Sequence, residues 1–210
     1  MPVEAAQYPV NLILTGQECL VVGGGSVAAR KVDGLLACGA KVRVIATIAG
    51  PELRARAVSL EERPYQRGDV AGFRLVIAAT NDRAVNHAVY EDAMAAGIWI
   101  NTADDPAACT FTLPSVVRRG PIMVTVSTAG YSPALSTWLR AHVEDELGPE
   151  YEVLLELLSE ARNDMKAAGR STEEADWRSA LDSDMLDLIR AGQVGRAKER
   201  LRAWLSSSSD

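Results

Sequence analysis

The sequence predicts an α/β fold: a parallel, Rossmann-like sheet, then a β-hairpin with one helix, then a small C-terminal helical domain. Apolar runs alternate with amphipathic helical segments over residues 1–110, a pattern typical of parallel strands joined by crossover helices. A glycine turn at Gly23-Gly24-Gly25 separates the first strand from its helix. After residue 110 two β-rich runs follow each other and the remainder is helical. We therefore place domain boundaries at 1–110, 111–147 and 148–210.

The first strand, turn and helix are the most informative stretch. Cys19–Val22 has the apolar character of a buried strand, Ser26–Cys38 is helical, and Lys41–Ala46 is a second strand. Between them, Gly23, Gly25 and Ala28 occupy the three small positions of a G-x-G-x-x-G/A fingerprint.

Each small residue of this fingerprint has a physical purpose. Gly23 permits a tight turn, Gly25 lets a diphosphate approach the backbone, and Ala28 lets the helix pack closely on the sheet. The free N–H groups and the dipole at the helix start favour phosphate. The turn therefore predicts a nucleotide site, although a glycine-rich turn also precedes many ordinary helices.

The end of the second strand lacks the acidic residue that usually binds the ribose of NAD about 20 positions after the glycines. The segment Arg43–Ile48 offers the Thr47 hydroxyl and backbone groups instead. Arg43 suggests NADP, but strand alternation could also point it away from the cofactor. The choice between NAD and NADP stays open on these grounds.

Further elements complete the predicted sheet. Residues Tyr8–Leu14 form an apolar lead-in that suits an edge strand or chain packed beneath the sheet. The later strands are Ser59–Tyr65, Phe73–Ala79 and Ile98–Asn101, and the later helices are Pro51–Ala57 and Arg83–Ala96. The residues Thr80-Asn81-Asp82 can cap the second of these helices. Ligands of such sheets bind at the carboxyl ends of the strands.

The second half of the chain changes character. The runs Phe111–Val117 and Ile122–Ser127 are joined by Arg118-Arg119-Gly120-Pro121, which predicts an antiparallel hairpin. A helix begins at Pro133 and reaches about Leu147. Three apolar stripes then predict a helical core: Leu154, Leu157, Leu158, Ala161, Met165; Met185, Leu188, Ile189; and Val194, Ala197, Leu201, Trp204.

Composition narrows the class of protein. The chain has 210 residues, 48% of them hydrophobic and 24% charged, as in ordinary globular proteins. No apolar run could span a bilayer, and the N-terminus does not look like a secretory signal. The three cysteines show neither metal-site nor disulfide spacing. We expect a cytoplasmic protein without a membrane partner, and the net charge of −6 argues against nucleic acid.

The candidate chemistry lies after the fifth strand. Asp104 stands in a loop that faces the predicted crevice, where a carboxylate could be a general base or a ligand to a metal being delivered. Asp104 and Asp105 also suit a turn before Pro106. Arg118, Arg119 and Arg140 could bind substrate carboxylates, or belong to a solvated turn and helix face. Neither histidine has a partner at metal-ligand spacing, and no resident metal site is expected.

Taken together, the motifs resemble the dehydrogenase/ferrochelatase module of siroheme synthases, over about residues 8–147. The segments that carry the resemblance, in order, are Val21–Lys31, Ala78–Asp82, Asn101–Pro106, Phe111–Ser115 and Val126–Pro133. Because five ordered segments match, the resemblance is more specific than the glycine turn alone.

The resemblance implies NAD-dependent oxidation of precorrin-2 to sirohydrochlorin, and in some members insertion of ferrous iron. It also implies a homodimer built on the hairpin and the helix after it. The catalytic aspartate of the family falls on Asp104, and Thr128, a candidate for substrate binding, replaces a serine of the Ser/Gly loop that is modified in some relatives. The cofactor contacts fall on Gly24, Gly25, Ser26, Val27, Thr47, Ile48, Thr80 and Asn81.

Two other functions stay open. A nucleotide-sensing module would bind NAD(H) to control a partner without turnover, but would not need the loop Asn101–Pro106 or the hairpin after it. A dehydrogenase for another small substrate is disfavoured, because the chain has no Tyr-x-x-x-Lys pair and no obvious histidine base.

Overall fold

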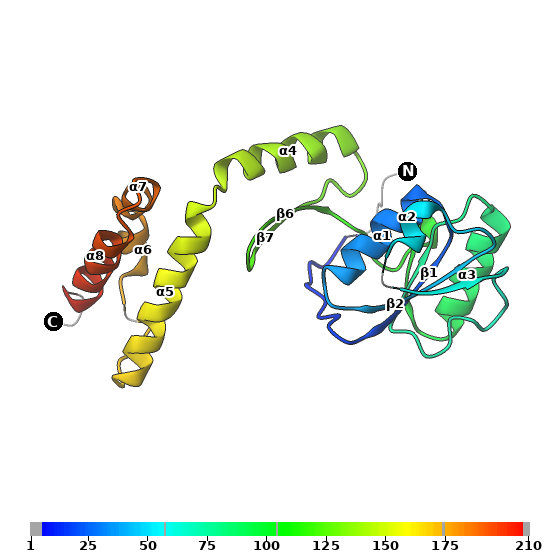
Figure 1. Ribbon diagram of the computed structural model, residues 1–210, viewed down its shortest axis with the longest axis horizontal. Helices are drawn as coiled ribbons and strands as arrows, with labels where there is room; N and C mark the ends of the chain where they lie inside the picture. Colours follow the sequence, from blue (N-terminus) through cyan, green and yellow to red (C-terminus); the bar gives the residue numbers. More distant parts are fainter. Residues whose placement is uncertain (1–5, 57, 104, 174, 208–210) are drawn as a thin grey trace. The chain divides into compact units, whose positions relative to one another are not determined.

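The computed structural model describes residues 6–56, 58–103, 105–173 and 175–207. The chain divides into two compact units (Figure 1). The first holds the described residues up to Leu113 together with Thr128–Ser132, and the second holds Pro114–Ser127 and the chain from Pro133 onward. In the described residues, no helix is long and apolar enough to cross a membrane. The predicted three-part boundaries stay a prediction.

The first unit is built on a five-stranded, all-parallel sheet of strand order β3-β2-β1-β4-β5. Its strands are β1 (Glu18–Val22), β2 (Lys41–Ala46), β3 (Ser59–Glu62), β4 (Leu75–Ala78) and β5 (Trp99–Thr102). Its helices are α1 (Ser26–Leu36), α2 (Pro51–Arg54) and α3 (Arg83–Ala95). The strand order reverses direction at β1 and β4, and this switch point is where open α/β sheets bind ligands.

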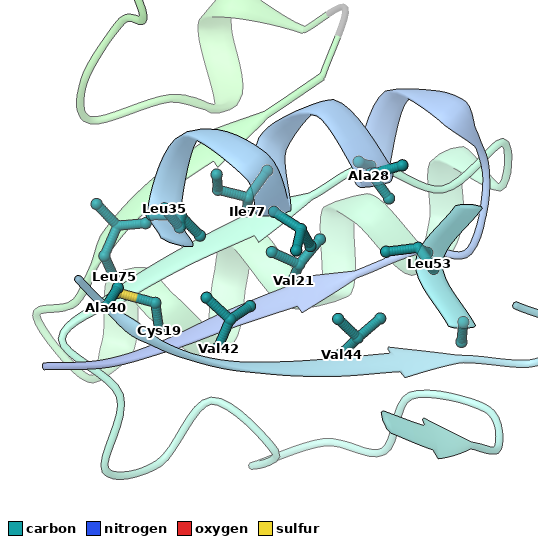
Figure 2. Packing of buried hydrophobic residues seen from close by; sticks show 14 of the residues in the cluster. Cys19, Val21, Ala28, Leu35, Ala40, Val42, Val44, Leu53, Leu75 and Ile77 are labelled. Atoms are coloured by element: carbon teal, nitrogen blue, oxygen red, sulfur yellow. The ribbon is translucent and has the colours of Figure 1, made fainter. Parts of the chain in front are cut away.

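Both faces of the sheet are buried, which is why its strands are apolar runs rather than alternating patterns. In β1, Cys19 and Val21 point into a cluster with α1 and α2, and Leu20 and Val22 point into a second cluster with α3. Figure 2 shows the first cluster, with α1 lying across the strands and Ala28 close above the sheet. The small side chain of Ala28 is fully buried, as the fingerprint requires.

Most predicted elements of this unit are confirmed, and the corrections concern their ends. The strand at β2 has the predicted bounds, whereas β3 and β4 are shorter than predicted and α2 ends at Arg54. The apolar lead-in Tyr8–Leu14 forms neither an edge strand nor a packed layer. Only Leu14 is buried, while Tyr8 and Ile13 are exposed. An apolar run without a neighbouring strand to pair with gains nothing from extended pairing.

The second unit begins with the predicted antiparallel hairpin, β6 (Ser115–Arg119) and β7 (Ile122–Val126). Strand β6 starts later than predicted, β7 starts at the predicted Ile122 and ends one residue early, and Arg118 and Arg119 belong to β6 rather than to the turn. Arg119 pairs with Ile122, so the turn is the pair Gly120-Pro121. Gly120 there has a φ of +50°, in the left-handed region that favours glycine. Helix α4 (Pro133–Glu146) packs against both strands.

The rest of the unit is a helical core made by α5 (Glu150–Ala167), α6 (Trp177–Leu181), α7 (Met185–Arg190) and α8 (Val194–Ser207). The first two predicted stripes lie in it, with Leu158 and Leu188 half-buried at its border. The third stripe is wrong at both ends. Val194 and Trp204 are exposed, and Leu205 is buried with Ala197 and Leu201 instead, because positions four apart share one face of a helix.

Candidate functional site

The loops that follow β1, β2, β4 and β5 lie at one edge of the parallel sheet, because all these strands run in the same direction. Backbone hydrogen bonds join the loops after β1 and β4 to the ends of neighbouring strands. The Gly23 N–H donates to the carbonyl of Ile45 at 2.9 Å, and the Ala79 N–H donates to that of Val22 at 2.7 Å. The glycine turn therefore starts between the ends of β2 and β4, at the switch point of the sheet.

Gly23 and Gly24 are required by close packing of backbone on backbone. A Cβ on Gly23 would lie 2.3 Å from the carbonyl oxygen of Ala79, and one on Gly24 would lie 1.9 Å from that of Ile48. Gly23 also has a φ of +137°. The Gly50 N–H donates to the Gly24 carbonyl at 2.9 Å, so the glycine turn and the loop after β2 hold each other.

Gly25 differs from Gly23 and Gly24, because a Cβ at Gly25 would meet nothing within 4 Å. It is the N-cap residue of α1, and no side chain caps this helix. Gly25 and Ser26 are exposed and Val27 is half-buried. Open space beside an uncapped helix start suits a phosphate group, which accepts hydrogen bonds from the first N–H groups of the helix. The residues present therefore fit the diphosphate of a dinucleotide.

The loop after β2 is fixed by Glu62, at the end of β3. The Ala49 N–H donates to Glu62 Oε1 at 3.1 Å, and Arg54 forms an ion pair with the same oxygen. The hydrogen bond from Ala49 holds the pKa of Glu62 below its ordinary value, with Arg54 adding to the effect. Thr47 is exposed, and the Ile48 side chain is 77% exposed. Glu62 was not anticipated, because its partners Ala49 and Arg54 lie 13 and 8 residues earlier in the chain, in the loop after β2 and in α2.

Arg43 does not face this loop. It lies in the middle of β2, where it forms an ion pair with Glu61 at 3.5 Å and stacks its guanidinium over the ring of Phe73 at 5.4 Å. Strand alternation therefore decides its direction, as one of the two readings of the sequence expected. The position of Arg43 therefore does not support a preference for NADP.

The turn after β4 is closed by its own side chains. Asp82 caps α3 by accepting hydrogen bonds from the backbone N–H groups of Ala84 and Val85, as the sequence predicted. The Thr80 hydroxyl accepts from the Asp82 N–H at 3.1 Å and donates to Asn86 Oδ1 at 2.7 Å. Asn86 was not anticipated, although a polar residue on the inner face of an amphipathic helix was the available signal.

The loop after β5 carries the predicted catalytic residue, Asp104, which lies outside the described residues. Its flanks are held by Cys109, whose Sγ accepts from the Thr102 N–H at 3.2 Å and lies 3.2 Å from the Asp105 carbonyl oxygen. Burial raises the pKa of the Cys109 thiol, and the Thr102 N–H acts weakly in the opposite direction. Thr110 exchanges two further hydrogen bonds with Ile100. Side chains thus cover the edge of β5, a role that the sequence did not reveal.

The predicted substrate residues fall in both units. In the second unit, Arg119 donates to the Leu147 carbonyl at 2.7 Å and Arg140 forms an ion pair with Glu144. Arg119 therefore caps the end of α4 in this structure, while Arg118 is exposed on β6. In the first unit, the Thr128 hydroxyl donates to the Ser132 carbonyl at 3.1 Å. Substrate binding by these four residues stays a prediction.

In the described part of the chain, no group of three His, Cys, Asp or Glu side chains could hold a metal ion. His87 lies near Glu91, and His142 stacks on Trp138 with ring centroids 5.1 Å apart.

Comparison with known proteins places this arrangement in a family. Residues 10–115 match the family described as putative NAD(P)-binding. The siroheme synthase of Nitrosococcus oceani is 38% identical over 206 residues, covering 95% of this chain and 44% of the relative. That of Nitrosomonas eutropha is 35% identical over 210 residues, covering 97% and 44%. The chain thus spans less than half the length of these curated relatives.

A solved structure extends the likeness to nearly the whole chain. SirC, precorrin-2 dehydrogenase, superposes with a TM-score of 0.70 at 25% identity, covering 96% of this chain and 98% of that one. The resemblance to the siroheme synthase module is therefore confirmed, and so is the predicted fold class. With its glycine turn, parallel sheet and matching residues 10–115, the chain belongs to the putative NAD(P)-binding family.

Proposed function

We propose that this protein oxidises precorrin-2 to sirohydrochlorin with NAD as hydride acceptor, in siroheme biosynthesis. The observation that carries the cofactor part is the open space at Gly25, which lies at an uncapped helix start directly after the two tightly packed glycines Gly23 and Gly24. The tetrapyrrole part is supported by the likeness to a precorrin-2 dehydrogenase over nearly the full length of both chains.

Each loop at the carboxyl edge of the sheet binds a different part of the cofactor. The backbone N–H groups at Gly25, Ser26 and Val27 hold the diphosphate at the start of α1. Thr47 and the exposed side chain of Ile48 hold the adenosine half at the end of β2. Thr80 and Asn81 hold the nicotinamide half at the end of β4. Gly23 and Gly24 keep the backbone close enough for these contacts. When bound, NAD supplies the acceptor for the hydride that leaves the substrate.

NAD is preferred over NADP in this proposal. The 2′-phosphate of NADP usually requires an arginine near the end of β2. Arg43 forms an ion pair with Glu61 and stacks over Phe73, and Arg54 forms an ion pair with Glu62. Neither guanidinium is therefore available for that phosphate.

Asp104 acts as the general base that accepts the proton released when precorrin-2 is oxidised. In the sequence, Asp104 lies between Ala103 and Asp105, two residues of the loop that follows β5 at the carboxyl edge of the sheet. The hydrogen bonds of Cys109 to Thr102 and Asp105 hold both ends of that loop. Arg118, Arg119, Arg140 and Thr128 bind the carboxylate-rich macrocycle.

The proposal is tested by anaerobic incubation of the protein with precorrin-2 and NAD, following NADH and tetrapyrrole absorbance. We expect Asp104→Asn to lower kcat by about 100-fold or more, the usual share of a general base, while the NADH dissociation constant stays within about twofold. Asp105→Asn is the matched control, since it removes the neighbouring carboxylate. Equal turnover in Asp104→Asn and the parent would contradict the base role.

Two alternative functions are outcomes of the same experiment. NADH binding without any turnover of precorrin-2 would favour a nucleotide-sensing module. Ferrous iron added as a substrate after the oxidation tests for a ferrochelatase, and a protein-dependent shift to the siroheme spectrum would add that activity.

We also propose that the protein is a homodimer of the cytoplasm. Helix α4 has no buried residue, and its Leu135 and Trp138 are 47% and 60% exposed. An exposed apolar helix next to a two-stranded sheet is typical of a surface that a second copy covers. The three cysteines are free thiols, as is usual in a reducing compartment.

A further inference from the structure

The side chain of Asn86 is directed at a single residue. It lies on the inner face of α3, 7% exposed, one turn before the fully buried Val89. Its Oδ1 accepts from the Thr80 N–H at 3.1 Å and from the Thr80 hydroxyl at 2.7 Å. Its Nδ2 donates to the Thr80 carbonyl at 3.0 Å. All three hydrogen bonds therefore go to Thr80.

Thr80 is the place where the chain leaves the sheet. The ladder between β1 and β4 ends at Val22 and Ala78, and the Ala79 N–H still donates to β1. At Thr80 the backbone donor and acceptor turn to the Asn86 amide instead of a neighbouring strand. One side chain thus takes the place of the next rung of the sheet, which fixes the direction of the backbone at the start of the turn.

The Thr80 hydroxyl is also used inside the turn, because it accepts from the Asp82 N–H and donates to Asn86. Asn81, in contrast, is exposed and its side chain makes no hydrogen bond among the described residues. The turn therefore exposes the Asn81 side chain, while the hydroxyl and the backbone groups of Thr80 are bound by Asn86.

We propose that Asn86 is a positioning residue for the cofactor: it holds the Thr80–Asn81 backbone in the orientation that the nicotinamide half requires. This inference rests on the proposed function, because it assumes that a dinucleotide lies over the end of β4. It assigns a role to a buried helix residue that contacts the cofactor only through Thr80.

The experiment compares Asn86→Ala with Val89→Ala, a truncation on the same buried face of α3 that removes no hydrogen bond to the turn. NADH affinity is measured by fluorescence titration, thermal stability by calorimetry, and backbone amide exchange at Thr80 and Asn81 by NMR. Both variants lose thermal stability, since both remove buried atoms. Only Asn86→Ala weakens NADH binding, by about tenfold or more, and speeds exchange at Thr80, because its N–H loses its acceptor.

Asn86→Asp provides a second test that keeps the side-chain volume. It retains an acceptor for the Thr80 N–H but cannot donate to the Thr80 carbonyl. We expect NADH affinity between those of the parent and Asn86→Ala, and exchange at Thr80 closer to the parent. If Asn86→Ala does not fold, the NADH affinity of Asn86→Asp tests the positioning role of Asn86.

The outcomes separate this inference from the proposed function. Equal NADH affinity in Asn86→Ala, Val89→Ala and the parent would overturn the positioning role and leave Asn86 as a structural group. If the parent itself binds no NADH, the proposed function is overturned. Exchange at Thr80 then still shows whether Asn86 holds the turn: unchanged exchange in Asn86→Ala overturns that as well.

Discussion

At the scale of single residues, the three consecutive glycines of the turn serve different purposes. Gly23 and Gly24 lie against carbonyl oxygens of neighbouring loops, so a side chain would collide with backbone that cannot yield. Gly25 faces open space, so its lack of a side chain matters to a ligand and not to folding. The same residue type is thus required twice for packing and once for binding.

We therefore predict opposite effects of two alanine substitutions. Gly24→Ala should destabilise the first unit by about 2 kcal/mol or more, because its Cβ would overlap the Ile48 carbonyl. Gly25→Ala should keep the free energy of unfolding within about 0.5 kcal/mol of the parent yet weaken NADH binding by about tenfold. Urea unfolding and NADH titration on both variants check this.

The converse pattern would contradict the assignment of Gly25. If Gly25→Ala bound NADH like the parent, the diphosphate would lie elsewhere. If it unfolded as easily as Gly24→Ala, the helix start would need the glycine for folding.

At the scale of elements, the segment after β3 is held by ion pairs in addition to its buried apolar residue Val70. Arg63 donates to both carboxylate oxygens of Asp69, at 2.6 and 3.0 Å, and also to Glu61. Arg67 reaches the carboxylates of Glu91 and Asp92 on α3. These contacts fasten the connection between β3 and β4 to the sheet and to α3.

This connection should be sensitive to acid. The hydrogen bond from Arg63 lowers the pKa of Asp69, so the pair contributes stability above the unfolded pKa of about 4. That contribution is lost as the pH falls through the lower folded pKa. Asp69→Asn should cost about 1–3 kcal/mol at pH 7, and the difference from the parent should shrink below about pH 4.

Urea unfolding at several pH values measures this difference. Glu18→Gln is the control, because the Lys41–Glu18 pair is exposed and 3.8 Å apart, and such pairs contribute about 0–1 kcal/mol. A constant difference between Asp69→Asn and the parent across the acid range would contradict the role of the ion pair.

At the scale of the whole molecule, helix α4 exposes the apolar side chains of Leu135 and Trp138. It packs on the hairpin, yet none of its residues is buried. Trp138 also stacks on His142, one turn later on the same face. A face of this kind is stable in water when a second copy covers it.

Trp138→Glu should therefore convert the proposed dimer to a monomer, because a charge would be buried in the proposed interface without a partner. Light scattering after size exclusion should give twice the chain mass of 22.5 kDa for the parent and that mass for the variant. Tyr8→Glu, at an exposed aromatic residue of the first unit, should leave the mass unchanged. A parent protein that is already monomeric at micromolar concentration would contradict the proposal.

Much of the fold could be predicted because its signals are local. The strands β1 and β2, the glycine turn and the Asp82 cap follow from residue types at neighbouring positions, and the structure places them as predicted. Errors arose where the outcome depends on a neighbour. The run Tyr8–Leu14 has a strand-like composition, but it forms no strand in the described part of the chain. On α8, Leu205 is buried in place of the predicted Trp204.

By itself, the sequence determined the order of elements, the loops at the carboxyl edge and the residue types able to bind a dinucleotide. Only the tertiary structure decided which side chains hold those loops. Glu62 holds the loop after β2, Asn86 the turn after β4 and Cys109 the loop after β5. The physical reason is that a hydrogen bond depends on which groups the packed sheet and helices bring within reach, and the type of one residue does not specify its partner.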